Sequence, residues 1–307
     1  MSEPMSLDPQ GHPWDGYAFA LICPDAVVKR AVTAIITRFV DAGFTIVRCN
    51  AVHVTPGRSD EAFGIDVMER GDPYRFRLLD SLFDLGPSVA LVVRDDQLGH
   101  SELGTHERLR RLKGATDPAA SRVGTVRWDF GGVNVLLGLL HTADTPARSA
   151  WEATTLAPEL GLSAEVTPVP EGDWRTQAAL CDTGHQEIRD FDAVLLGLRS
   201  RVLVTSWHLL PDDARLVARD ALVAGTLADI GTGARIARDL PAGPTAALLR
   251  AEWRPGLPGL DARALRAALI GVELTVDPWE QLVLTTSAAF APRSQSRRPE
   301  PEPEAAR

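Results

Sequence analysis

A histidine and an aspartate stand three residues apart in the segment HTADT, residues 141–145. A neutral imidazole is a good nucleophile near pH 7, so His141 could carry a phosphoryl group on one ring nitrogen while an acceptor holds the other. A histidine at the end of a strand can also make only structural hydrogen bonds. The spacing alone therefore leaves two interpretations of His141 open, a nucleophile and a structural residue.

Two arginines and a threonine upstream of this histidine are of the types that bind phosphate. Arg110 lies in a basic segment and Arg127 lies in GTVRWDF, and a planar guanidinium fork matches phosphate oxygens. In GATDP, residues 114–118, the hydroxyl of Thr116 could contact a phosphate or its Mg²⁺. Alternatively, Arg110 lies on a solvated helix face and GATDP is a simple turn, because Gly, Asp and Pro are ordinary turn residues.

The elements that must position these residues alternate between strands and helices. Apolar runs, helical spacing and glycine stops predict the order β-α-β-α-β-α-β-α, which fits a split β-α-β sheet with helices on one face. The expected strands are 17–23, 45–54, 88–94 and 134–141, and the expected helices are 26–44, 74–86, 103–114 and 145–157. His141 would then end the fourth strand.

A chain of 307 residues is long enough for two domains of ordinary size. The predicted organisation is a disordered lead at 1–15, a first α+β domain at 16–157, a Pro- and Gly-rich linker at 158–173, a second α+β domain at 174–292 and a disordered tail at 293–307. In the second domain we expect strands at 191–198, 201–210 and 280–291, and helices at 211–225 and 259–271.

Charge and cysteine content exclude several classes of protein. The formal net charge is −9, which argues against general nucleic-acid binding because phosphate contacts need a basic face. The three cysteines, Cys23, Cys49 and Cys181, are widely spaced and suggest neither a disulfide framework nor a zinc site. No apolar stretch has the pattern of a signal peptide or of a membrane span. We therefore expect a cytoplasmic protein without a side-chain metal site.

Residues 17–157 resemble the nucleoside diphosphate kinase family. The resemblance rests on ALICPDAVVKRAVTAIITRFVDAGFTIVR, GPSVALVV, LRRLKGATDPAASRVGTVRWDF and HTADTPARSAWE, which keep their relative spacing over slightly less than half of the chain. It implies a ferredoxin-like α+β fold. It also implies ping-pong transfer of the γ-phosphoryl group from ATP or another nucleoside triphosphate, through a phosphohistidine, to a nucleoside diphosphate, with Mg²⁺ bridging the phosphates.

The resemblance assigns roles to six residues of this chain. It implies that His141 is the catalytic nucleophile and that Glu152, eleven residues later, orients its imidazole. Asp144 matches the aspartate of the family's His-Gly-Ser-Asp motif, and Arg110, Thr116 and Arg127 match the phosphate-binding residues. The family usually forms hexamers, so a homo-oligomer is also implied.

The chain departs from the family pattern at several of these places. Cys23 replaces the lysine of a Lys-Pro-Asp motif that contacts the transferred phosphoryl group, and losing such a donor typically costs about 10²–10³ in rate. Gly138 stands where the family has an asparagine, and Ala143 where it has a serine. Tyr74 and Phe76 are aromatic candidates for stacking a base.

Two functions therefore remain open. One is phosphoryl transfer through His141. The other is a catalytically weak nucleotide-binding or scaffolding protein whose second domain binds a small molecule or a partner.

The second domain has a fainter resemblance, to the chorismate pyruvate-lyase fold that is shared with ligand-sensing domains of some regulators. It rests on residues 209–231 and on 279–292 as a closing strand. Ala288 and Asp192 fall near the places of the lyase's glutamate and arginine, so the resemblance implies binding of a small molecule or partner rather than lyase chemistry.

Overall fold

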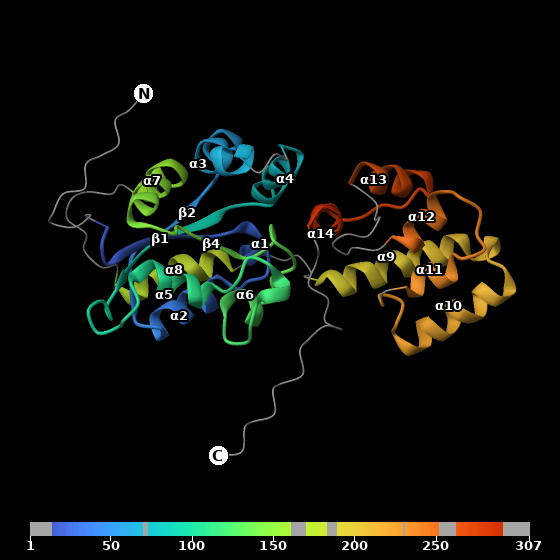
Figure 1. Cartoon of the computed structure of the whole chain (residues 1–307), viewed down its shortest axis with the longest axis horizontal. Coiled ribbons are helices and arrows are strands. Elements are labelled where there is room, and N and C mark those ends of the chain that lie inside the picture. Colours follow the sequence, from blue (N-terminus) through green and yellow to red (C-terminus); the bar gives the residue numbers. More distant parts are fainter. Residues whose placement is uncertain are drawn as a thin grey trace, which may run out of the picture. The chain divides into compact units, whose positions relative to one another are not determined.

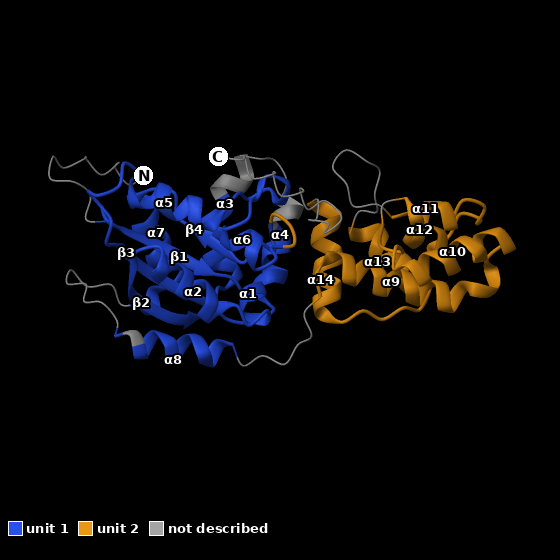
Figure 2. Ribbon diagram, turned by 90° about the horizontal axis from the view of Figure 1, so that it is seen from below, with its two compact units in different colours: residues 1–132, 136–188 blue, residues 133–135, 189–307 orange. Residues whose placement is uncertain are grey.

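The computed structural model describes residues 14–69, 73–160, 170–182, 189–229, 231–251 and 262–290, with the backbone alone at 65–69, 73–76 and 171. Two compact units divide the chain (Figure 2). The first comprises residues 1–132 and 136–188, and the second comprises 133–135 and 189–307.

The first unit is built on a four-stranded antiparallel sheet in the order β2-β3-β1-β4. Its strands are β1 (Tyr17–Ile22), β2 (Phe44–Val52), β3 (Ser88–Asp95) and β4 (Leu140–Thr142). Its helices are α1 (Pro24–Val28), α2 (Val32–Asp41), α3 (Pro56–Glu69), α4 (Pro73–Phe83), α5 (Thr105–Lys113), α6 (Val126–Asp129), α7 (Pro146–Leu156) and α8 (Glu171–Cys181), with short 3-10 helices at Pro118–Ala120 and Pro158–Leu160. This open antiparallel sheet with helices confirms the predicted ferredoxin-like α+β fold of the first unit.

Helices cover both faces of this sheet, so the prediction of helices on one face is wrong. Alternate residues of β1 enter two different cores: Ala20 and Ile22 pack with α1, α2 and α5, whereas Phe19 and Leu21 pack with α3 and α7. Figure 1 shows α3, α4 and α7 on one side of the sheet and α2, α5 and α8 on the other. Successive side chains of a strand point to opposite faces, so an unbroken apolar strand indicates a sheet buried on both.

The strand before the histidine is much shorter than predicted. Only residues 140–142 pair with β1, and His141 lies opposite Leu21. Leu139 has a left-handed backbone, with φ of 70°, which interrupts an extended conformation. Its N–H is donated to the buried carboxylate of Asp25 at 2.9 Å, so the turn that leads into β4 is fixed from the start of α1.

Helix α8 belongs to the first unit, although its residues from 174 onward were expected in the second domain. Its buried Trp174 and Ala178 join the core on the α2 face of the sheet. Asp182, just after α8, accepts hydrogen bonds from the backbone N–H groups of Val32 and Thr33 at 3.0 and 2.9 Å. The carboxylate thus satisfies two otherwise unpaired donors at the start of α2.

The second unit is helical in every element that the structure describes, so the predicted strands at 191–198, 201–210 and 280–291 are wrong. Its helices are α9 (Phe191–Ser206), α10 (Asp212–Ala224), α11 (Thr232–Ile236), α12 (Pro244–Arg250), α13 (Ala262–Gly271) and α14 (Pro278–Ala289), with a 3-10 helix at Trp207–Leu209. The segment that suggested a lyase-like closing strand is α14. We expected an α+β second domain, and the described residues do not form one.

The spacing of the buried residues shows why the segment predicted as a strand at 280–291 is a helix. Trp279, Leu282, Val283 and Thr286 are buried at intervals of three and four, which is the period of a helix. Asp277 forms a capping box with Glu280 and so starts α14. Short apolar runs are ambiguous between strand and helix, and here the caps and the period of burial favour the helix.

A buried arginine ties the second unit together. Arg199 on α9 is 1% exposed, and its guanidinium donates to the backbone carbonyls of Leu227 and Ala251 at 2.9 and 2.8 Å, and of Asp229 at 3.3 Å. One side chain thus pairs with carbonyls of two loops. Buried carbonyls left unpaired would cost free energy.

In the part of the chain that the structure describes, none of the helices has the length and apolar character needed to span a membrane.

Replacing Arg199 with methionine is expected to destabilise the second unit by about 3 kcal/mol, because each buried acceptor left unpaired costs about 1–3 kcal/mol. Urea denaturation of the full chain, followed by tryptophan fluorescence, measures this change. Arg219→Met, which removes an exposed arginine of α10, is the matched control. An equal loss of stability in both variants would contradict the role given to Arg199.

Candidate functional site

The imidazole of His141 is held by a buried carboxylate. His141 Nε2 lies 2.7 Å from Glu152 Oε2; the histidine side chain is 32% exposed and that of Glu152 only 1%. His141 comes from β4 and Glu152 from the middle of α7, which begins with Thr145 as its N-cap. A hydrogen bond at Nε2 leaves Nδ1 of the imidazole available as a nucleophile.

Two further side chains fix this pair. Arg148, one turn before Glu152 on α7, donates through Nε to Glu152 Oε1 at 2.7 Å and through Nη2 to the carbonyl of Ala62 at 2.6 Å. The ring of Phe63 meets the imidazole edge-on, with centroids 5.1 Å apart. Burial raises the pKa of Glu152, but the hydrogen bonds and charges of His141 and Arg148 outweigh it and hold the pKa below its usual range. Glu152 is therefore ionised.

Arg127 and Thr116 lie together beside the histidine strand. Arg127 Nη1 donates to the hydroxyl of Thr116 at 2.8 Å, while its Nε and Nη2 donate to the carbonyls of Gly138 and Leu140 at 3.2 and 3.0 Å. Burial lowers the pKa of the Arg127 guanidinium from its ordinary value. The carbonyl of Leu140, the residue before His141, thus accepts a hydrogen bond from the guanidinium. This bond fixes the position of Arg127 relative to the histidine strand.

Gly138 lies against the guanidinium of Arg127. A Cβ at this position would lie 3.2 Å from Arg127 Nε, a tight contact that a small shift of the arginine side chain would have to relieve. The sequence resemblance implies an asparagine at this position, and in this chain the guanidinium lies beside a residue without a side chain.

The remaining two predicted residues are less closely joined to this group. Arg110 on α5 is 58% exposed and donates through Nε and Nη2 to both carboxylate oxygens of Glu107, at 2.6 and 2.8 Å. Asp144 is exposed, and it interacts electrostatically with Arg110 and Arg127. The structure thus brings His141 with Glu152 and Arg127 with Thr116 by direct hydrogen bonds, and it links Arg110 and Asp144 to the site through charge only.

Cys23 lies at the end of β1 in the same cluster, with its backbone N–H donated to the carbonyl of Leu139 at 2.9 Å. Burial, followed by the charge of Asp25, strongly raises the pKa of its thiol, while Arg127 and Lys113 act in the opposite direction. The thiol is therefore neutral, and it supplies no positive charge here. Burial also raises the pKa of Asp25 to about 6.

Sequence reasoning missed three residues of the site: Arg148, Phe63 and Lys113. The signal for Arg148 was its spacing of four from Glu152, which places an arginine and a glutamate on one helix face. Lys113 follows Leu109 by four residues, so helical spacing already put it on the buried face of α5; both side chains are buried. For Phe63, on α3, no local signal pointed to the histidine. The side chains of Tyr74 and Phe76 lie outside the described residues.

The turn after α5 delivers Thr116 to Arg127. Gly114, which ends α5, has φ of 91°, and a Cβ there would lie 2.5 Å from Thr125 Oγ1. Its carbonyl lies 3.5 Å from Arg127 Nη1. Only glycine fits this backbone and this close approach, so the GATDP segment is a turn that also carries a site residue.

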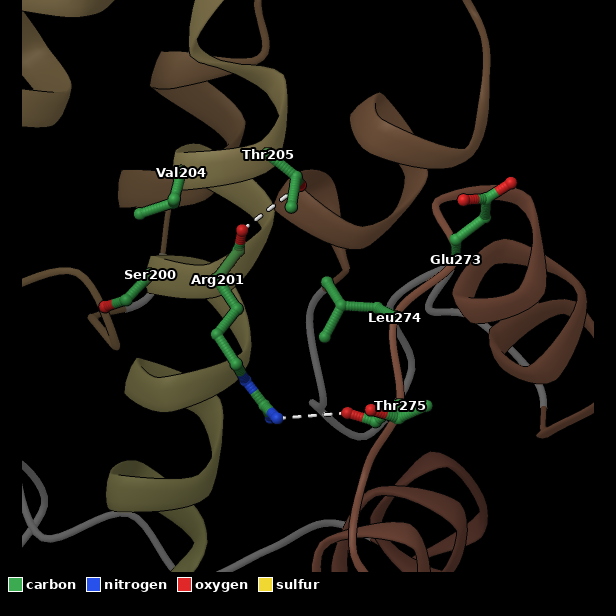
Figure 3. A pocket seen from close by; sticks show the side chains of 7 residues that line it. All are labelled: Ser200, Arg201, Val204, Thr205, Glu273, Leu274 and Thr275. Atoms are coloured by element: carbon green, nitrogen blue, oxygen red, sulfur yellow. Dashed lines mark hydrogen bonds between the residues drawn. The ribbon is translucent and has the colours of Figure 1, made fainter.

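Away from this site, the second unit has an open hollow of 330 Å³ between α9 and residues 273–275 (Figure 3). The guanidinium of Arg201 points across it and donates to the carbonyl of Thr275 at 3.0 Å and to Glu280 Oε1 at 2.8 Å. The Arg201 cation in the lining of this hollow is thus already paired.

In the described part of the chain, no three His, Cys, Asp or Glu side chains are grouped so that they could hold a metal ion.

Comparison with known proteins matches residues 17–159 to the family model described as nucleoside diphosphate kinase. A nucleoside diphosphate kinase of Trichormus variabilis is 32% identical over 136 residues, 44% of this chain and 83% of that protein. The corresponding protein of Geotalea uraniireducens is 31% identical over 144 residues, 47% of this chain and 96% of its own length. Both matches thus cover more than four fifths of the relative and less than half of this chain.

Solved structures similar to this chain include a halophilic nucleoside diphosphate kinase from Halobacterium salinarum in complex with CDP. It has 22% identity and a TM-score of 0.41, and the match covers 52% of this chain and 98% of that one. The Aquifex aeolicus nucleoside diphosphate kinase has 25% identity and a TM-score of 0.40, over 49% and 98% of the two chains.

Gly114→Ala is expected to lower the free energy of unfolding by more than Gly124→Ala, with a difference of about 1–2 kcal/mol. Gly124 has a similar φ of 87° but open space where a Cβ would stand, so it serves as a control for backbone strain alone. Urea denaturation midpoints of the two variants measure the contribution of the contact with Thr125. Equal midpoints would show that this close approach contributes nothing.

Proposed function

This chain belongs to the nucleoside diphosphate kinase family through its N-terminal unit, and on that premise we propose that it transfers a γ-phosphoryl group from a nucleoside triphosphate to a nucleoside diphosphate. The group would be carried as a phosphohistidine on His141. The observation that carries this proposal is the 2.7 Å hydrogen bond between His141 Nε2 and the buried, ionised Glu152.

The transfer step follows from that bond. Nε2 keeps its proton and donates a hydrogen bond to Glu152. The lone pair on Nδ1 is therefore free to attack the γ-phosphorus. The bond from that phosphorus to its bridging oxygen breaks, and the electron pair leaves with the nucleoside diphosphate. The imidazole gains a positive charge as the N–P bond forms, and the Glu152 carboxylate balances it. The reverse sequence passes the group to a second nucleoside diphosphate.

Binding of the phosphates would fall to Arg127 and Thr116, with Arg110 and Asp144 at the exposed side. Arg127 is already oriented by the carbonyls of Gly138 and Leu140, so its position costs little to fix when a phosphate binds. Arg110 would exchange part of its contact with Glu107 for the nucleotide. Mg²⁺ would arrive on the triphosphate, because proteins usually bind it together with substrate phosphates, where it neutralises charge.

The second candidate is a nucleotide-binding protein without turnover, whose function lies in its second unit. Cys23 favours it, since a neutral thiol stands where the family resemblance implies a lysine on the transferred group. The helical second unit and its open hollow would then carry the contact with a small molecule or a partner.

Incubation with γ-labelled ATP and Mg²⁺ separates the two functions. We expect an acid-labile, base-stable label on the chain, as for a phosphohistidine, and its complete loss in His141→Ala. His100→Ala, which removes an exposed histidine of the same unit, should keep the label. Nucleotide binding without any label would favour the second candidate. A label that survives His141→Ala would refute the assignment of this histidine.

Glu152→Gln is expected to slow labelling of His141 by about 10²-fold, because the amide can still accept the imidazole N–H but cannot balance its developing charge. Single-turnover labelling kinetics measure this rate. Glu159→Gln is the control: Glu159 is largely exposed and pairs with Arg58 at 2.8 Å. A labelling rate for Glu152→Gln equal to that of the control would mean that the charge of Glu152 is not used.

A further inference from the structure

Lys113 is a buried cation to which no described residue is bonded. Its side chain lies at the end of α5 on the same face as Leu109, and the residue is 7% exposed. Within the part of the chain that the structure describes, Lys113 forms neither a hydrogen bond nor an ion pair. A buried ammonium is costly unless something compensates its charge. The charge is not needed here for the end of the helix, since Arg111 in the same last turn is exposed and has Glu107 as its partner.

The charges around Lys113 are those of the candidate site. Burial is the largest influence on its pKa, followed by the repelling Arg127 of α6, the attracting Asp144 after β4 and Glu152 of α7, and the repelling Arg110 of its own helix. Together they lower the pKa of Lys113 to about 8. Its carboxylate neighbours do not bond to it.

Those two carboxylates are unsuited to pair with Lys113. Glu152 uses both oxygens, one for His141 and one for Arg148. Asp144 is exposed to solvent. Lys113 therefore stands beside Arg127 and Arg110 with no described residue bonded to its ammonium, which is the arrangement expected where an anion binds.

Cys23 interacts electrostatically with both Arg127 and Lys113. The charge of Lys113 acts on the Cys23 thiol, so the helix α5 brings an ammonium towards the end of β1, where the family's lysine is replaced by this neutral group. The two positions are distant in the sequence, and only the packing of α5 against the sheet brings them together.

We propose that Lys113 contacts the oxygens of the transferred phosphoryl group at His141, and so supplies the cation that position 23 lacks. This rests on the proposed phosphoryl transfer. Arg127 and Thr116 would hold the polyphosphate from the turn side, while Lys113 faces the terminal phosphate from α5. A compact ammonium with three donors suits an acceptor group that changes shape during transfer.

The proposal makes the affinity for a triphosphate depend on pH in a stated direction. The free protein loses the Lys113 proton as the pH rises through about 8. A bound triphosphate favours the charged lysine, so binding takes up a proton in this range. Affinity is therefore expected to fall by about tenfold from about pH 7 to about pH 9. Mg²⁺-bound ATP does not itself titrate here, since its terminal phosphate has a pKa of about 6 or lower.

Calorimetric titration of Mg·ATP into His141→Ala tests this, since that background cannot pass the phosphoryl group to His141. We expect affinity to fall about tenfold over the pH range, and proton uptake near pH 8 in buffers of different ionisation enthalpy. His141→Ala/Lys113→Met is expected to bind weakly at both ends of the range, without the pH dependence. His141→Ala/Arg94→Met is the control, because Arg94 lies opposite Tyr17, at the other end of β1 from Cys23.

Lys113→Met in the otherwise native chain provides a second measurement. Labelling of the histidine is expected to slow by about 10²–10³-fold, as for other donors to a reacting phosphoryl group. Its urea denaturation midpoint should equal or exceed that of the native chain, because the variant removes a buried charge. A loss of labelling with a lower midpoint would indicate a structural role and overturn the proposal.

Unchanged affinity and unchanged pH dependence in the double variant would also overturn it. The proposed function fails differently. If His141→Ala binds no Mg·ATP and the native chain gains no label, nucleotide transfer itself is refuted, and the role of Lys113 falls with it.

Discussion

Glu152 is a buried carboxylate, and the candidate site is arranged around keeping it charged. Removing a carboxylate from water raises its pKa, so ionisation has to be secured by partners on both oxygens. His141 and Arg148 provide them, and Arg148 is itself anchored on the backbone of α3. The histidine, the helix α7 and the helix α3 are thereby fixed to one another through a single charged group.

The cost of burying charge also applies to the cations around Glu152. Arg127 and Lys113 are cations whose pKa values are lowered, chiefly by burial, although carboxylates nearby act in the opposite direction. Arg127 is partly compensated by backbone carbonyls. Lys113 is not bonded to any described group. Clusters of buried groups with displaced pKa values are more frequent at functional sites than elsewhere, because catalytic and binding groups need pKa values matched to their task.

The second unit uses buried charge differently. Arg199 donates to carbonyls of its own loops, so its guanidinium takes the place of regular backbone pairing between short helices. Glu280 forms ion pairs with Arg189 and Arg201 at 2.7 and 2.8 Å. It is also part of the capping box that starts α14. These partners all lie within the second unit. Their contacts organise a helical fold, whereas Lys113 of the first unit is bonded to no described residue.

The sequence by itself determined several elements of the first unit. Periodicity and glycine stops placed the strands 17–22, 44–52 and 88–95 and the helix after the histidine within a few residues. Local rules sufficed for these elements because they depend on residues close together in the chain, whereas the roles expected for His141 and Glu152 came from the family resemblance. The strands expected in the second unit failed for the converse reason: short apolar runs fit either period until packing decides which face is buried.

Tertiary structure alone decided which of the candidate residues meet. Lys113 and Cys23 are far apart in the sequence and come to interact only because α5 packs beside β1 and β4. The left-handed turn at Leu139 depends on a carboxylate more than a hundred residues away, and it makes the fourth strand short. Side-chain burial and charge compensation are sums over such distant contacts. No local pattern in the sequence contains them, and that is why the geometry of the candidate site emerged only from the fold.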